Sequence, residues 1–211
     1  ATLRSDTSSR FKGDNKTGTF PSFSAGWLLS GEDFYNDSSV VNRIKLKGSW
    51  GQMGNQTLPA DNPTINISSL SEQYANYAIG GGSIATGAML SQIGNPNLKW
   101  ETSQSLNFGV DLGFFESKLL FSAEWYQIDT KDLITRDYSL ISTTAIDAGA
   151  PLVNLGSVKN TGFDISIGFH DTTDSEWTYG IDFNISHYDN EVTELISDFQ
   201  SGSSFRSGVF T

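Results

Sequence analysis

Few residues in this sequence have the types and spacing that catalysis or metal binding needs. The chain has no cysteine and only two histidines, His170 and His187. Neither histidine has the short spacing to a second ligand that metal sites show, and no Ser–His–Asp order suggests a hydrolase. Both lie at or near the end of a predicted strand, where a polar structural role is the favoured interpretation. The sequence therefore predicts no catalytic residue, no enzyme activity and no cofactor.

A glycine-rich stretch, GGGSIATGAM, has the glycine spacing of a phosphate-binding loop. Four residues separate Gly82 from Gly87. A phosphate loop continues with Lys and then Ser or Thr, whereas Ala88 and Met89 stand at those positions here. We therefore predict a mobile loop without a phosphate site.

Three aspartates, Asp129, Asp132 and Asp137, begin the polar segment 129–157 and could be imagined to bind calcium. Their spacing lacks the glycine and the terminal glutamate of an EF-hand loop. A solvated acidic loop is the favoured interpretation, and no metal site is predicted.

The elements that position these residues follow a period of two rather than a helical period. Apolar and polar residues alternate from Trp100 to Phe114, and comparable runs recur along the chain. Such alternation is typical of strands with one apolar face. We predict an all-β protein with seven strands, at residues 1–6, 19–29, 44–52, 98–114, 119–127, 161–169 and 177–185.

Connection lengths indicate how these strands are joined. After a connection at 30–43 that is longer than a minimal turn, long polar connections alternate with short turns: 54–97, 115–117, 129–157, 171–176 and 189–211. Outer-membrane barrels have long extracellular loops at one end and short periplasmic turns at the other. The lengths therefore favour an antiparallel up-and-down transmembrane β-barrel wall.

Strand length and composition favour the same architecture. Residues 102–114, at about 3.4 Å each and with a tilt of about 45°, span roughly 30 Å, the thickness of the hydrocarbon core. Charged residues make up 18% of the chain, below the average for soluble domains. The net charge of −11 argues against nucleic acid as a partner, because such binding rests on basic residues.

The hairpin 98–127 gives a test of the barrel. We expect Trp100, Leu106, Phe108, Val110, Leu112 and Phe114 to face lipid, and Ser103, Ser105, Asn107, Gly109 and Asp111 to face the lumen. Trp100 is expected at the outer interface, with Trp27 and Trp177 at the inner one, as aromatic girdles. The alternative is a soluble β-sandwich, such as a glycan-binding or adhesin module. It requires Phe108, Val110, Leu112, Ile165, Ile167, Ile181 and Phe183 to be buried between two sheets.

Four stretches carry a family resemblance. They are 8–34, the strand IKLKGSWGQMGNQ at 44–56, the hairpin 94–134 that begins GNPNLKWE, and 154–195. The last has an N-x-G-x-x-x-N-x-G strand start (Asn154, Gly156, Asn160, Gly162) and an N-x-V strand end (Asn190, Val192). Together they resemble the C-terminal barrel region of SusC/RagA-family TonB-dependent transporters. Asp164 departs mildly from the family, which more often has Glu there.

The resemblance implies an outer-membrane importer of nutrients in a Gram-negative, Bacteroidota-type bacterium, with a barrel of about 22 strands. It implies glycans or oligosaccharides as the first candidate cargo and peptides as the second. The implied partners are a SusD-like surface lipoprotein, outer-membrane lipid, and the TonB–ExbB–ExbD system, which acts through a plug. We expect residues 1–211 to be part of one barrel domain and a fragment of a larger protein, without signal sequence or plug.

Ligand contacts in such a barrel are expected from long loops and the lumen face. Tyr74 and Tyr77, in the 54–97 connection, could stack on a sugar or pack on the lipoprotein; alternatively, they only anchor that loop. Lumen-side acids could line the path against the plug, although hydration is their favoured role: Glu101, Asp111, Glu124, Asp164 and Asp182.

Overall fold

The computed structural model describes residues 1–35, 40–58, 62–79, 83–137, 150–173 and 176–194. For residues 69–79, 83–85 and 89 within these ranges, only the backbone is described.

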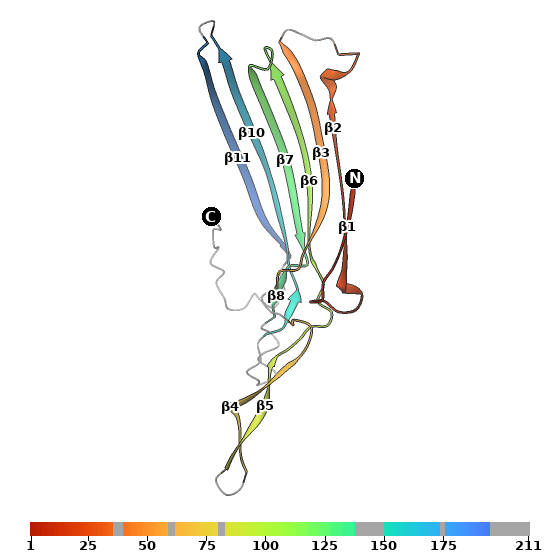
Figure 1. The fold of residues 1–211 in the computed structure, drawn as a ribbon, viewed down its shortest axis with the longest axis vertical. Helices are drawn as coiled ribbons and strands as arrows, with labels where there is room; N and C mark the ends of the chain where they lie inside the picture. Colours follow the sequence, from red (N-terminus) through yellow and green to blue (C-terminus); the bar gives the residue numbers. More distant parts are fainter. Residues whose placement is uncertain (36–39, 59–61, 80–82, 138–149, 174–175, 195–211) are drawn as a thin grey trace.

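A single antiparallel sheet of seven strands forms most of the described chain (Figure 1). Its strand order follows the sequence, so each strand pairs with the next one in the sheet. The strands are β1 (Thr2–Thr7), β2 (Thr17–Leu28), β3 (Val41–Asn55), β6 (Glu101–Phe114), β7 (Leu119–Lys131), β10 (Ser157–Thr172) and β11 (Thr178–Glu194). The predicted all-β, up-and-down antiparallel architecture is confirmed. The sheet is open, with β1 and β11 at its edges.

From β3 onward, the connections between sheet strands sort by length between the two ends of the sheet (Figure 1). The β6–β7 and β10–β11 connections are short turns at one end. In the first, Phe115, Glu116 and Ser117 all have φ between 52° and 65°, and Lys118 donates a backbone hydrogen bond to Phe115 at 3.2 Å. The opposite end, called the long-loop end below, holds the β1–β2, β3–β6 and β7–β10 connections. From β3 onward this arrangement matches the predicted alternation. The connection between β2 (ending at Leu28) and β3 (beginning at Val41) is longer than a turn, as predicted, although it joins strands at the end with the short turns.

Two hairpins stand inside connections that we predicted as loops. β4 (Ile67–Ile79) pairs with β5 (Ser83–Gln92), and β8 (Ile134–Arg136) pairs with β9 (Leu152–Asn154). The β4–β5 hairpin projects away from the long-loop end (Figure 1). The prediction of a mobile loop over GGGSIATGAM was therefore wrong for residues 83–89, which belong to β5; residues 80–82 lie outside the described residues. Two 3₁₀ turns, Gly13–Lys16 and Leu29–Gly31, complete the described elements.

Buried hydrophobic residues gather at the long-loop end rather than against a face of the sheet. The buried cluster consists of Phe11, Phe20, Leu58, Leu98, Trp100 and Leu152, with Ile134 packed on it. None of the seven residues that a sandwich would bury is buried: Phe108 is 55% exposed and Ile181 is 73% exposed. In the described part of the chain, no second sheet covers the apolar face. The β-sandwich alternative is therefore contradicted.

No helix among the described residues is long and apolar enough to cross a membrane.

Candidate functional site

An apolar belt occupies one face of the sheet. Because side chains alternate along a strand, the pairing register places outward residues of neighbouring strands in rows. One row contains Leu46, Val110, Ala123, Ile165 and Ile185, and the next contains Ile44, Leu112, Phe121, Ile167 and Phe183. Rings stack across strands within the belt, with centroids of Phe23 and Trp50 5.2 Å apart and of Phe108 and Trp125 6.3 Å apart. The side chains in these two rows are apolar and offer water no hydrogen bonds, so this face suits contact with hydrocarbon.

The belt ends in polar residues at the long-loop end, although the strands continue. The outward row beyond it contains Gln52, Gln104, Asp129, Lys159 and Glu191. The strands are therefore longer than the apolar belt. At the long-loop end their outward side chains are polar and suit contact with water.

Two tryptophans lie at strand ends opposite the long-loop end, one near the end of β2 and one just before β11. Trp27 lies in the outward register of Leu46, is 45% exposed, and donates from Nε1 to Glu32 Oε1 at 2.8 Å. Trp177, just before β11, is 75% exposed. A ring on an apolar surface with its N–H on a polar group is typical of an interfacial anchor. These positions agree with the predicted inner girdle.

Trp100 does not face lipid, contrary to our prediction. It precedes β6, is 7% exposed, and packs on Phe11 and Phe20 with ring centroids 5.1 and 5.6 Å away. Its Nε1 donates to the carbonyl oxygen of Asn15 at 3.0 Å. The chain entering β6 folds beneath the β1–β2 connection, which covers a residue that strand alternation alone would leave outside.

The opposite face carries polar side chains that bond to one another. Lys47 Nζ lies 2.9 Å from Asp111 Oδ1 and 3.7 Å from Glu124 Oε2, and it reaches both because Gly109 lies beneath its chain. A Cβ on Gly109 would come within 2.9 Å of Lys47 Cε. Ser122 Oγ also donates to Asp111, at 2.8 Å. The glycine thus lets a lysine cross from β3 to acids on β6 and β7.

The remaining predicted lumen residues lie on this polar face as well. Asn107 donates to Ser49 Oγ at 3.0 Å, and Ser103 shares a hydrogen bond with Thr130 at 3.0 Å. Glu101 accepts from Asn55 Nδ2 at 3.3 Å. By register, Asp164 stands opposite Glu124 and Asp182 opposite Gly168. The five acids lie on one face and on four strands, because Glu101 and Asp111 both belong to β6.

Both histidines have structural contacts. His170 Nε2 lies 3.3 Å from Asp182 Oδ2, and its ring occupies the space above Gly180. His187 packs on Phe163 with ring centroids 5.7 Å apart and lies 3.3 Å from Asp189.

The aspartates considered for calcium are not gathered into a site. Asp129 accepts from Gln127 at 2.7 Å, Asp132 pairs with Lys99 at 2.9 Å, and the backbone N–H of Asp137 bonds to Pro151 at 2.9 Å. No group of three or more potential ligand residues that could hold a metal ion occurs among the described residues.

An ion pair closes the short-turn end. Lys118 Nζ, in the β6–β7 turn, lies 2.8 Å from Asp171 Oδ1 at the end of β10. The hydrogen bond and the charge of Asp171 raise the pKa of Lys118. Lys118 is exposed and Asp171 is half-buried, and the pair fastens the turn to its neighbouring strand.

Tyr74 and Tyr77 lie in strand β4, within the projecting hairpin. Their side chains lie outside the described residues, so a contact with a sugar or with a partner protein stays a prediction.

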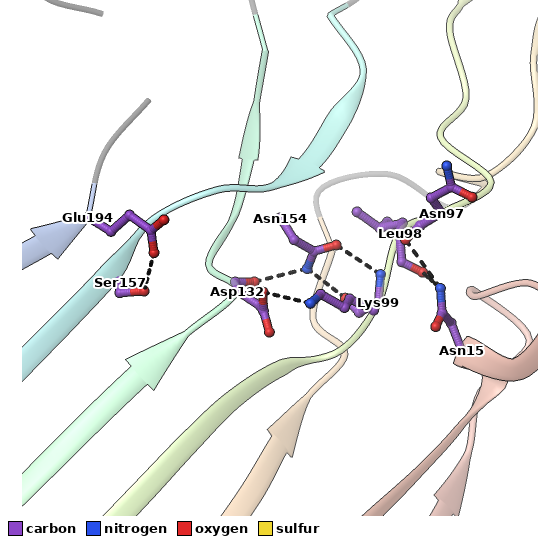
Figure 2. Close-up of polar contacts among 8 residues, drawn as sticks. All are labelled: Asn15, Asn97, Leu98, Lys99, Asp132, Asn154, Ser157 and Glu194. Carbon is purple, nitrogen blue, oxygen red and sulfur yellow. Dashed lines mark hydrogen bonds and ion pairs between the residues drawn. The ribbon is translucent and has the colours of Figure 1, made fainter. Parts of the chain in front are cut away.

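The residues that sequence reasoning missed are asparagines at the long-loop end. Asn15, Asn95 and Asn154 join segments that are far apart in the sequence (Figure 2 shows Asn15 and Asn154). Asn154 stood out only as the first residue of the N-x-G-x-x-x-N-x-G pattern, which gave it no role. The buried Leu98 and Trp100 beside them indicate a packed rim where the sequence suggested only loop ends.

Comparison with known proteins agrees with this architecture. The family model described as "TonB dependent receptor-like, beta-barrel" matches residues 1–207. TonB-dependent receptor P3 of Formosa agariphila is 32% identical over 198 residues, covering 92% of this chain and 18% of that protein. TonB-dependent receptor SusC of Bacteroides thetaiotaomicron is 32% identical over 195 residues, covering 92% of this chain and 19% of that protein.

Solved structures show the same fold. The RagAB peptide importer in its 'open-open' state matches with a TM-score of 0.78 and 26% identity, over 92% of this chain and 20% of that one. The 'closed-closed' state of the same importer matches with a TM-score of 0.75. This chain therefore spans about a fifth of the length of its relatives. With its single two-faced antiparallel sheet and the family match over residues 1–207, the chain belongs to the TonB-dependent receptor-like β-barrel family, and its relatives include SusC.

Proposed function

We propose that this chain is a wall segment of a TonB-dependent active importer in the outer membrane. The observation that carries the proposal is the apolar belt, which is exposed on one face of the sheet while the other face bonds to itself. Such a sheet suits a wall between lipid and a wet lumen, because lipid accepts the apolar side chains and water the polar ones. Residues 1–211 are, in this proposal, part of one barrel domain.

The proposed location is the outer membrane of a Gram-negative, Bacteroidota-type bacterium. Its support is family membership and the two relatives from Formosa agariphila and Bacteroides thetaiotaomicron. The wall does not itself use energy in this proposal; the TonB–ExbB–ExbD system would act through a plug that lies elsewhere in the protein.

The proposed cargo is a nutrient, with glycans or oligosaccharides first and peptides second. The likeness to the RagAB peptide transporter supports peptides as the second candidate. A SusD-like surface lipoprotein is the proposed partner at the long-loop end. Tyr74 and Tyr77 are the candidate contacts for a sugar or for that lipoprotein, because β4 projects from this end (Figure 1).

Uptake by cells that carry the full-length gene tests this function. Deletion of the gene should abolish accumulation of a labelled oligosaccharide mixture, a labelled peptide mixture or both, and deletion of tonB should have the same effect. Complementation should restore uptake. Fractionation that finds the protein outside the outer membrane, or uptake that is unchanged in the deletion strain for both mixtures, would overturn the proposal.

A further inference from the structure

The segment Gly94–Trp100, called the strap below, is bound by other parts of the chain along most of its length. Figure 2 shows its contacts at Asn97, Leu98 and Lys99. Asn15 Nδ2 donates to the carbonyl oxygens of Asn97 and Leu98, at 3.2 and 3.3 Å. Leu98 is fully buried in the cluster described above, next to Trp100. The β1–β2 connection therefore fastens the strap from one side.

Asn154, the last residue of β9, fastens the strap from the other side (Figure 2). Its Oδ1 accepts from the backbone N–H of Lys99 at 2.9 Å, and its Nδ2 donates to the carbonyl oxygens of Lys99 at 2.8 Å and Asp132 at 2.9 Å. Lys99 Nζ and Asp132 Oδ1 form an ion pair at 2.9 Å. One amide side chain thus joins the strap to the β7–β8 corner through three hydrogen bonds.

The strap also holds the base of the β4–β5 hairpin. Gly94 N donates to Asn66 Oδ1 at 2.8 Å, and Asn95 N donates to the carbonyl oxygen of Pro63 at 2.9 Å. A Cβ on Gly94 would lie 2.3–2.5 Å from backbone atoms of Ile65, so the two backbones touch. Asn95 Nδ2 then reaches the carbonyl oxygen of Leu152 in β9, at 3.0 Å.

We propose that the strap locks the β1–β2 connection, the base of the β4–β5 hairpin and the β8–β9 hairpin into one rigid unit, with Asn154 as its positioning residue. These three parts come from different connections of the sheet, and besides the strap they share the buried cluster and a hydrogen bond from Arg10 Nη1 to the carbonyl oxygen of Gln56 at 3.3 Å. With the strap bound, the projecting hairpin holds one orientation relative to the sheet. The inference goes beyond the proposed import function and depends on no cargo.

The test uses the full-length protein with an Asn154→Asp substitution. Aspartate keeps the shape of asparagine and the acceptor for Lys99 N–H, but it replaces the N–H₂ donor with an oxygen that faces two carbonyl oxygens. Asn15→Ala is a second variant that releases the strap from the opposite side. Asn107→Ala is the matched control, because it removes one asparagine hydrogen bond within the sheet, away from the strap.

Two readouts report on the strap without requiring transport. Backbone amides of the strap should exchange with deuterium faster by on the order of tenfold or more in both strap variants, because each lost hydrogen bond lowers the local opening energy. Spin labels introduced by Thr86→Cys on the hairpin and Glu191→Cys on β11 should change from one narrow distance to a broad distribution. Asn107→Ala should leave both readouts unchanged.

Folding of the barrel is checked separately by its resistance to urea. Faster exchange and a broadened distance in a folded protein support the proposal. If Asn154→Asp does not fold, the same readouts on Asn15→Ala decide. Unchanged exchange and one narrow distance in a folded strap variant would overturn the rigid unit, whatever the uptake assay shows.

Discussion

The apolar belt makes a quantitative prediction for charge placed at its centre. Val110 lies in the middle row of the belt, beside Leu46 and Ala123. Arginine at the midplane of a lipid-facing barrel surface lowers the free energy of unfolding by about 2–4 kcal/mol, against about 0–1 kcal/mol near the interfaces. Val110→Arg should therefore reduce the folding equilibrium constant by about 30- to 700-fold.

Two matched substitutions separate lipid exposure from general disruption of β6. Gln104→Arg introduces the same residue on the same face, but in the polar row beyond the belt, where the penalty should be about 0–1 kcal/mol. Asn107→Arg introduces it on the polar face. Reversible denaturant titration of the full-length protein in lipid vesicles measures all three. Equal penalties for Val110→Arg and Gln104→Arg, or for Val110→Arg and Asn107→Arg, would refute a lipid-facing belt.

Three further substitutions test packing, two of them by the same titration and each with its own control, and the third by the spin-label distance. Leu98→Ala should destabilise by about 2–5 kcal/mol, because Leu98 is fully buried, whereas Leu120→Ala, at a 42% exposed position, should change stability by about 0.5 kcal/mol or less. Gly162→Ala should destabilise by about 1–3 kcal/mol, since its methyl group would lie 2.6 Å from a backbone oxygen of β11; Gly48→Ala meets its nearest atom at 3.5 Å and should be tolerated. Gly94→Ala should leave the sheet intact but broaden the spin-label distance of the hairpin; an unchanged distance would contradict the backbone contact at its base.

Much of the sheet could be predicted because its signal is local. Alternation from Leu106 to Phe114 defines which face of β6 is apolar, and the next strand repeats the pattern, so register follows from matching apolar residues. The turn at Phe115–Ser117 was predictable as a break between two such runs. β7 and β10 extend beyond their predicted ends because polar outward residues such as Asp129 and Lys159 continue the pairing without continuing the apolar pattern. β6 instead begins at Glu101, three residues later than predicted.

The long-loop end could not be predicted, because its contacts join distant segments. Trp100 has the parity of a lipid-facing residue, and only the β1–β2 connection, which covers it from more than eighty residues earlier in the sequence, gives it a buried place. The β4–β5 hairpin has a single charged residue and many small residues. Loops often have the same composition, so composition could not distinguish the hairpin from a loop.

The N-x-G-x-x-x-N-x-G pattern gains a physical explanation from the structure. Asn154 holds the strap, Gly156 has a φ of 114°, and Asn160 accepts a hydrogen bond from Asn190 on the neighbouring strand at 2.5 Å. Gly162 leaves room for the Tyr126 side chain. The asparagines make hydrogen bonds and the glycines meet conformational or steric requirements. The spacing of the pattern alone does not indicate these roles.

The polar row beyond the belt determines whether the hydrogen bonds of the strap lie in lipid or in water. Four residues of strand beyond the belt, at about 3.4 Å each and tilted by about 40°, raise the rim roughly 10 Å above the hydrocarbon. The asparagine hydrogen bonds therefore operate where water competes for every donor and acceptor, and lipid gives them no protection. What shelters them is the chain itself, because Phe11, Leu98 and Trp100 form a small dry patch beside the bonded backbone. The long-loop end of this barrel would thus have its own small hydrophobic core. That core resembles the core of a soluble protein, although the sheet below it has a surface suited to lipid.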